Sequence, residues 1–297
     1  MGCGRSLQRQ RHREERHRAR RKAAISRNIH SRVTSECRPF LGPSTLKAFA
    51  GCPAFVGVER QDYPGARQKP QLREGSDRGM KIGIIGAGNI GATLTRRLTS
   101  LGHEVAVANS RGPDTLAALA AETGARAVPA SEAALDAALI VVTIPEKAVA
   151  TLPEGVLAGA APGAVVVDTG NYYPRRDGRI AAIETGMSES RWVAQQLRTP
   201  VIKAFNNIRA QHLLEMGRPA GTPGRIALPV AGDDPVAKDL VMRLVDDLGF
   251  DPVDAGGLDD SWRQQPGTPV YGTDLDAEGV RRALAGARPE RAPEWRA

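Results

Sequence analysis

The sequence predicts an α/β protein built on a doubly wound, mostly parallel sheet. Strand-length apolar segments alternate with segments of helical periodicity, and several of these strands lack any polar alternation. A Gly-x-Gly-x-x-Gly pattern (Gly86, Gly88, Gly91) follows the first strand. Strands without alternation are typical of parallel sheets buried on both faces, and right-handed crossovers then place helices on both sides.

The elements of this unit follow one another from residue 80. Val, Ile and Ala predominate in the expected strands, and Gly or Pro marks most helix ends. The expected strands span residues 80–88, 103–110, 125–129, 138–145, 163–171, 200–207, 225–233 and 250–257. The expected helices span residues 89–102, 113–124, 131–137, 146–152, 188–197, 234–249 and 275–287. Residues 258–274 lack periodicity and are expected to form an ordered loop, and the tail 288–297 is expected to be frayed.

The chain divides into three predicted parts, of which composition separates the first from the rest. Residues 1–79 carry 18 Lys and Arg against 7 Asp and Glu, whereas the remaining residues carry 23 against 26. We interpret 1–79 as a basic, disordered extension, or as sequence translated from a start codon assigned too early. Contact with nucleic acid or anionic lipid, an organelle transit peptide and N-myristoylation stay open as alternatives. Residues 80–200 are predicted to form a nucleotide-binding domain, and residues 201–297 a C-terminal α/β portion with an acceptor-site loop.

Several functional classes do not suit the part of the chain from residue 80 on. It contains no cysteine, which excludes a disulfide framework, a thiolate nucleophile and a cysteine metal site there. No His, Asp and Glu cluster has metal-ligand spacing, so no metal is expected. No apolar run reaches the roughly 20 residues of a membrane-spanning helix. We expect a cytoplasmic protein whose body binds neither membrane nor nucleic acid.

The segment 86–91 (GAGNIG) has the spacing of a dinucleotide-binding loop. Its glycines allow, in order, a tight turn, close approach of the backbone to a pyrophosphate, and close packing of helix against strand. The helix that begins at Asn89 would direct free N–H groups at the pyrophosphate. Because the motif follows an expected strand and opens a helix, it predicts dinucleotide binding in a Rossmann fold; an ordinary glycine-rich turn is the alternative.

The residues after the second strand predict which dinucleotide binds. Asn109 stands about 20 residues beyond the glycine loop, where an Asp or Glu usually binds the ribose 2′-hydroxyl. A carboxylate there would repel the additional phosphate of NADP, whereas Ser110 and Arg111 provide donors for it. We therefore predict NADP(H) as the cofactor. The structural alternative is a strand-end turn with a solvated arginine.

The carboxyl ends of the later strands should line the rest of the cofactor crevice. They place Thr143, Ile144 and Pro145 beside the cofactor, and residues 168–171 and 204–207 near the nicotinamide. Asn171, Asn206 and Asn207 are the candidates there, with turn formation and capping as their structural alternative. Lys203 is either a proton donor or a surface-facing or ion-paired residue. We can name no catalytic residue, which suits direct hydride transfer with little proton assistance.

Residues 80–112, the tripeptide 143–145 (TIP) and residues 201–207 (VIKAFNN) resemble the NADPH-dependent coenzyme F-420 reductase family, which passes hydride between NADPH and a deazaflavin. The resemblance covers about residues 80–275. It implies that Ala87, Gly88, Asn89 and Ile90 hold the pyrophosphate and that Ser110 and Arg111 take the 2′-phosphate. It also implies that Ile144 and Ala204 lie against the nicotinamide.

Residues 261–274 resemble a signature of a bacterial branch of this family. There Trp262, Arg263 and Gln264 shape the acceptor pocket; the alternative is that Trp262 anchors the loop to the core.

These observations predict an oxidoreductase that transfers hydride between NADP(H) and a deazaflavin-like or other small acceptor. Asn207 and Trp262 are predicted to contact that acceptor. A β-hydroxyacid or imine dehydrogenase is one alternative, although such enzymes normally add a long helical domain, whereas the residues after 200 still alternate strand and helix. A non-catalytic NADPH-sensing module is another. The expected partner is a small-molecule hydride acceptor, and a homodimer stays open beside a monomer.

Overall fold

The computed structural model describes residues 79–297. The predicted basic extension and its alternative roles therefore lie, except for Gly79, outside the described residues. Eight strands and the helices between them make up the described part, and its main sheet is six-stranded. The strands of this sheet are β1 (Lys81–Ile85), β2 (Glu104–Ala108), β3 (Arg126–Ala127), β4 (Leu139–Val142), β5 (Val165–Asp168) and β6 (Ile202–Lys203).

The strand order of the main sheet is β3-β2-β1-β4-β5-β6, and every neighbouring pair is parallel. The chain thus winds outward from β1 in one direction and then, from β4 on, in the other. This order confirms the predicted doubly wound sheet. It also places the change of direction between β1 and β4, where open α/β sheets bind ligands beyond the carboxyl ends of their strands.

In the central strands of the main sheet, alternate residues enter two apolar cores. In β4, Leu139 and Val141 belong to the core beneath α2 (Asn89–Ser100), whereas Ile140 and Val142 pack with Val193 of α7 (Glu189–Leu197). All four β4 side chains are buried. The uninterrupted apolar run in the sequence therefore reflects burial on both faces, as parallel sheets require.

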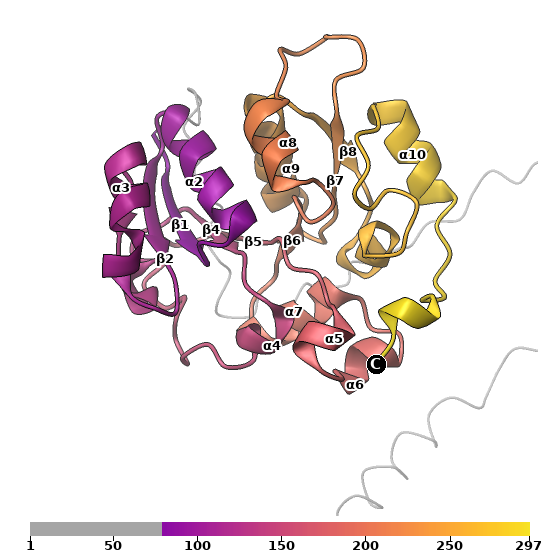
Figure 1. The fold of residues 1–297 in the computed structure, drawn as a ribbon, viewed down its shortest axis with the longest axis horizontal. Helices are drawn as coiled ribbons and strands as arrows, with labels where there is room; N and C mark the ends of the chain where they lie inside the picture. The colour runs from indigo at the N-terminus through magenta and orange to yellow at the C-terminus, as the bar shows by residue number, and fades with distance from the viewer. Residues whose placement is uncertain (1–78) are drawn as a thin grey trace, which may run out of the picture. The chain divides into compact units, whose positions relative to one another are not determined.

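Short helical elements connect the strands of the main sheet. Figure 1 shows α2 and α3 beside β1 and β2. The connecting elements are η1 (Pro113–Leu116), α3 (Ala117–Thr123), η2 (Ala130–Glu132), α4 (Glu146–Val149), α5 (Pro174–Asp177) and α6 (Ala181–Glu184), and α8 (Ala210–Glu215) follows the last strand of this sheet. The helix predicted over 131–137 is instead the single turn of 3-10 helix η2.

The C-terminal portion has a sheet of its own, β7 (Ala227–Val230) paired in parallel with β8 (Asp251–Asp254). An antiparallel bridge between Lys203 and Ala231 links β6 to the residue that follows β7. The helices α9 (Pro235–Asp247) and α10 (Ala277–Ala285) contact this small sheet (Figure 1). The predicted boundary at residue 200 falls just before β6, which still belongs to the main sheet.

Two expectations for the last forty residues need correction. The segment predicted as a loop begins with a 3-10 helix, η3 (Leu258–Gln264), and the tail predicted to fray contains another, η4 (Pro293–Trp295). The tail is held because Arg291 pairs with buried Glu189 and because the Trp295 ring lies 5.9 Å from that of Tyr173. Both partners are distant in sequence, so local periodicity could not reveal them.

Candidate functional site

The strand register places the predicted site residues along one edge of the main sheet. Ile85 of β1 lies between Ala108 of β2 and Val142 of β4, and Asp168 of β5 pairs with Val142 and Lys203. The residues that leave these strands continue the ladder: the N–H of Gly86 donates to Ala108 O over 2.8 Å, and that of Thr143 to Ile85 O over 2.9 Å. The glycine loop, Asn109, Thr143 and the tips of β5 and β6 thus share this carboxyl edge.

The three glycines of the loop differ in what surrounds them. Gly86 has a φ of +113°, and a Cβ there would lie 2.3 Å from Thr143 O. A Cβ at Gly91 would lie 1.9 Å from Gly86 O. Gly88 has an ordinary φ of −74°, and a Cβ there would meet no described atom within 4 Å. Packing within the chain thus requires glycine at Gly86 and Gly91, whereas Gly88 leaves open space at the helix start, as close approach of a ligand requires.

The start of α2 can accept an anion. Its first intrahelical bond runs from the Ala92 N–H to Gly88 O at 2.8 Å, so the N–H groups of the first turn lack an intrahelical acceptor. Gly88 provides no side-chain cap, and the first turn contains no acidic residue. The positive end of the helix dipole therefore faces the open space at Gly88, which fits the pyrophosphate of a dinucleotide.

The segment 109–112 (NSRG) contains one residue that shapes the turn and two whose side chains are exposed. Asn109 Oδ1 accepts the Arg111 N–H over 2.9 Å, and its Nδ2 donates to Thr115 Oγ1 over 2.9 Å. The Ser110 and Arg111 side chains are exposed and form no hydrogen bond or ion pair with the residues from 79 to 297. The neutral Asn109 fixes the turn, and the two donors beside it remain available.

The asparagines at the tips of β5 and β6 hold each other. Asn206 Nδ2 donates to Asn171 Oδ1 over 3.0 Å and to Gln264 O over 2.7 Å. Gln264 Nε2 donates back to Asn206 Oδ1 over 2.9 Å. Phe205, just before this cluster, has a φ of +61°, a strained conformation for a residue with a Cβ. The two strand tips and η3 are thereby fixed as one polar cluster.

Asn207 differs from its neighbours because its side chain has no partner. It is 1% exposed, and neither its Oδ1 nor its Nδ2 forms a hydrogen bond with the described residues. Leaving a buried amide unpaired costs about 1–3 kcal/mol. Of the three candidate asparagines, Asn207 is therefore the one whose amide is free to bind another group.

A buried charged cluster beneath the strand tips was not foreseen. Lys203 Nζ donates to Asp168 Oδ2 over 3.1 Å, and Ser190 Oγ donates to the same oxygen over 2.6 Å. Glu146 and Glu189 complete the cluster, and all four charged side chains are at most 2% exposed. The surface-facing alternative for Lys203 is therefore wrong, and its ion-paired alternative is what the structure shows.

The cluster holds more buried carboxylates than buried ammonium groups, and their pKa values respond. Burial, together with the negative charges of Glu189 and Asp168, raises the pKa of Glu146 well above its usual range. Burial also raises the pKa of Glu189, against the pull of Lys203 and Arg291. Burial alone would lower the pKa of Lys203, but the surrounding carboxylates outweigh this and raise it. These pKa shifts favour the charged form of Lys203 and the protonated forms of the two glutamates.

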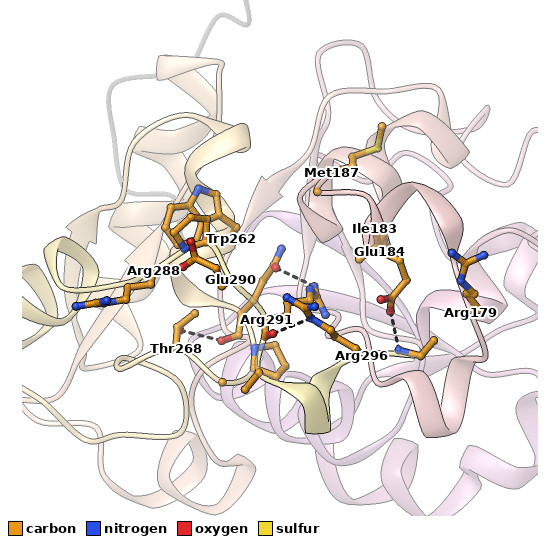
Figure 2. A pocket seen from close by; sticks show the side chains of 17 residues that line it. Arg179, Ile183, Glu184, Met187, Trp262, Thr268, Arg288, Glu290, Arg291 and Arg296 are labelled. Carbon is orange, nitrogen blue, oxygen red and sulfur yellow. Dashed lines mark hydrogen bonds between the residues drawn. The ribbon is translucent and has the colours of Figure 1, made fainter.

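The last residues of η3 lie in two different places. Gln264 joins the strand-tip cluster, whereas Trp262 lines a separate cavity of about 400 Å³. Figure 2 shows this cavity, whose lining includes none of the glycine-loop or strand-tip residues. The Arg263 guanidinium lies over the Trp262 ring at 5.4 Å from its centroid. The structure thus brings Gln264, but not Trp262, to the strand tips.

Within residues 79–297, every helix is too short or too polar to span a bilayer. Within the same range, no group of three His, Cys, Asp or Glu side chains is arranged to hold a metal ion.

Comparison with known proteins also indicates an NADP oxidoreductase. Residues 81–172 match the family described as NADP oxidoreductase, coenzyme F420-dependent. A stretch of 66 residues is 52% identical to the protein YjhV of Escherichia coli (strain K12); it makes up 22% of this chain and spans about half, 48%, of that relative.

Two solved structures are also similar. A hypothetical protein from Sinorhizobium meliloti is 30% identical with a TM-score of 0.55, over 66% of this chain and 95% of the other. A proposed F420-dependent NADP-reductase from Arthrobacter sp. FB24 is 25% identical with a TM-score of 0.49, over 61% of this chain and 86% of the other. Through residues 81–172, the chain belongs to the family of coenzyme F420-dependent NADP oxidoreductases.

Proposed function

We propose that this protein is an NADPH-dependent oxidoreductase that transfers hydride between NADP(H) and a flat small-molecule acceptor of the deazaflavin class. The observation that carries the proposal is the open space at Gly88 at the start of α2, combined with the two free donors Ser110 and Arg111 after β2. The first feature suits a pyrophosphate, and the second suits a 2′-phosphate.

Different residues of the chain would bind different parts of the dinucleotide. Gly86, Ala87, Gly88, Asn89, Ile90 and Gly91 would hold the pyrophosphate. Ser110 and Arg111 would hold the 2′-phosphate on the turn that Asn109 fixes. Thr143, Ile144 and Pro145 would line the path from these phosphates toward the tips of β5 and β6, where Ala204 lies.

The nicotinamide would supply the hydride when bound, and the protein would orient it and exclude water. Asn171 and Asn206 fix the strand tips by bonding to each other, so they would hold the wall of the site rigid. The unpaired amide of Asn207 would contact the acceptor. The buried Lys203–Asp168 pair lies beneath and would fix β5 and β6 in register. None of these roles needs a nucleophile or a metal.

The C-terminal portion supports this proposal over a hydroxyacid or imine dehydrogenase. Those enzymes normally carry a long helical second domain, whereas the residues here form the β7–β8 sheet with α9 and α10 around it. The expected partner is therefore a small acceptor that enters beside the strand tips.

A screen of hydride acceptors with the full chain tests the proposed reaction. We expect NADPH oxidation with a deazaflavin and none in its absence, measured by the loss of NADPH absorbance. A flavin, a cyclic imine and, with NADP⁺, a β-hydroxyacid serve as comparisons. Turnover of the imine or the hydroxyacid alone would favour a dehydrogenase of that type. Tight NADPH binding without oxidation in any mixture would favour a sensor instead.

Replacing Arg111 by alanine tests the cofactor assignment. We expect NADPH to bind about 10- to 100-fold more weakly, because one charge-assisted contact worth about 1.5–3 kcal/mol is lost. NADH, which lacks the 2′-phosphate, should lose little. Titration of both nucleotides into wild type and variant measures the difference, and Arg281→Ala on the exposed face of α10 is the control. Equal losses for the two nucleotides would contradict the assignment.

A further inference from the structure

The cavity beside Trp262 is built by three segments that are far apart in sequence. Its walls come from residues 179–187 around α6, from Trp262 of η3 with the residues 265–268 that follow this helix, and from the tail 288–297 (Figure 2). Its volume of about 400 Å³ is within the range of about 300–1,000 Å³ typical of small-molecule sites. The proposed cofactor site does not use it, since no glycine-loop or strand-tip residue lines it.

Cationic side chains outnumber anionic ones in this lining. The lining includes four arginines and two glutamates: Arg179, Arg288, Arg291, Arg296, Glu184 and Glu290. Only Arg291 pairs with a carboxylate of the described chain, namely Glu189 outside the cavity. The Glu184 carboxylate already accepts the Tyr172 hydroxyl over 2.8 Å and the Ala297 N–H over 3.1 Å. The other three guanidinium groups outnumber the two glutamates, so positive charge predominates among the side chains of this wall.

A buried amide in the same wall lacks an acceptor. Gln265 is 5% exposed, and its Oε1 accepts the Arg291 guanidinium over 2.9 Å. This bond fixes the orientation of the amide, because only the oxygen end can face a guanidinium. Its Nε2 is therefore the donor end, and it has no partner among the described residues although it is buried. The unmet requirement in this wall is for an acceptor atom, which an anion supplies and a cation does not.

We propose that this cavity binds a small organic anion through a phosphate or carboxylate group. Gln265 Nε2 and the Arg296 guanidinium are the donors, and the guanidinium fork matches the oxygens of either group. The half-buried Trp262 ring forms an apolar wall for the rest of the ligand. The site is separate from the dinucleotide loop and does not depend on the proposed hydride transfer.

Contacts of the residues around this site connect it to the tips of β5 and β6. Gln265 follows Gln264, which bonds to Asn206, and Arg291 joins the cavity wall to Glu189 of the buried cluster. An anion held by Gln265 and Arg296 therefore bridges η3 and the tail, and its binding should hold the tail in place.

Calorimetric titration of the full chain with inorganic phosphate and with citrate tests the proposal. Binding of phosphate alone would identify a phosphorylated ligand, binding of citrate alone a carboxylate ligand, and binding of both the shared anion chemistry. We expect the bound probe to alter the tryptophan fluorescence, because Trp262 lines the cavity. If neither probe binds in the millimolar range, the proposal is overturned.

Matched variants locate the binding. Gln265→Glu keeps the acceptor for Arg291 but replaces the free donor by an oxygen, and Arg296→Gln removes a cation. Each should weaken the bound probe at least about tenfold, since each removes a charge-assisted contact. Arg281→Gln removes the same charge outside the cavity and should bind both probes as wild type does. Arg111→Ala alters the dinucleotide site and should leave citrate binding and the tryptophan fluorescence response unchanged. Equal weakening by Arg281→Gln, or loss of binding only in Arg111→Ala, would overturn the proposal.

Discussion

Replacing Gly88 by valine is expected to abolish NADPH binding while the protein stays folded. The backbone there is extended, with a φ of −74° and a ψ of −165°, which a β-branched residue adopts readily. A Cβ at this position would meet no described atom within 4 Å, so packing within residues 79–297 does not oppose the substitution. The added methyl groups would instead fill the space at the start of α2, where the pyrophosphate must approach the backbone. We expect the Kd for NADPH to rise at least about 100-fold, or about 2.7 kcal/mol.

Gly91→Ala is the matched comparison for this prediction. Its Cβ would lie 1.9 Å from Gly86 O and 2.8 Å from Thr143 Cγ2, so it should lower the free energy of unfolding by about 1–3 kcal/mol or more. Urea denaturation and NADPH titration of both variants separate the two roles. If Gly88→Val bound NADPH as wild type does, the pyrophosphate would not lie at this helix start. If it unfolded the protein, Gly88 would have a structural role.

The fold could be predicted because its signals are local. Apolar runs of strand length, glycines at fixed spacing and helix-ending residues all act within a few positions of one another. The carboxyl-edge position of Asn171 and Asn206 followed from the sheet alone. That the two asparagines bind each other and Gln264 did not follow, because Gln264 lies 58 residues beyond Asn206.

The buried cluster and the tail depend on contacts between distant parts of the chain. Glu146 and Glu189 each stand in the first turn of a helix, where an acidic residue is normally exposed and favoured by the helix dipole. They are buried here because α4 and α7 contact each other, and burial of this kind has no local pattern. Arg291 reaches Glu189 across 102 residues of sequence. A charged tail without periodicity therefore resembled a frayed end, although its side chains complete a buried ion pair.

Replacing Lys203 by methionine is expected to cost about 3–5 kcal/mol of folding free energy. The methionine side chain fits the space of the lysine stem, but Asp168 then loses its cation while it stays 2% exposed at its side chain. The Ser190 hydroxyl and the Gly170 N–H still donate to it, so some of the charge remains stabilised. Urea denaturation at neutral pH measures the loss.

The double variant Lys203→Met, Asp168→Asn distinguishes a lost ion pair from lost packing. Replacing both members of a buried pair by neutral residues is often close to neutral, because neither charge is left without a partner. We expect the double variant to recover most of the stability that Lys203→Met loses. Should it be as unstable as the single variant, the lysine stem rather than its charge would hold β5 against β6. Recovery would instead show that the charge of Lys203 serves to neutralise Asp168. An ion pair would then stabilise the carboxyl edge of the sheet, although the neighbouring residues of β5 and β6 are apolar.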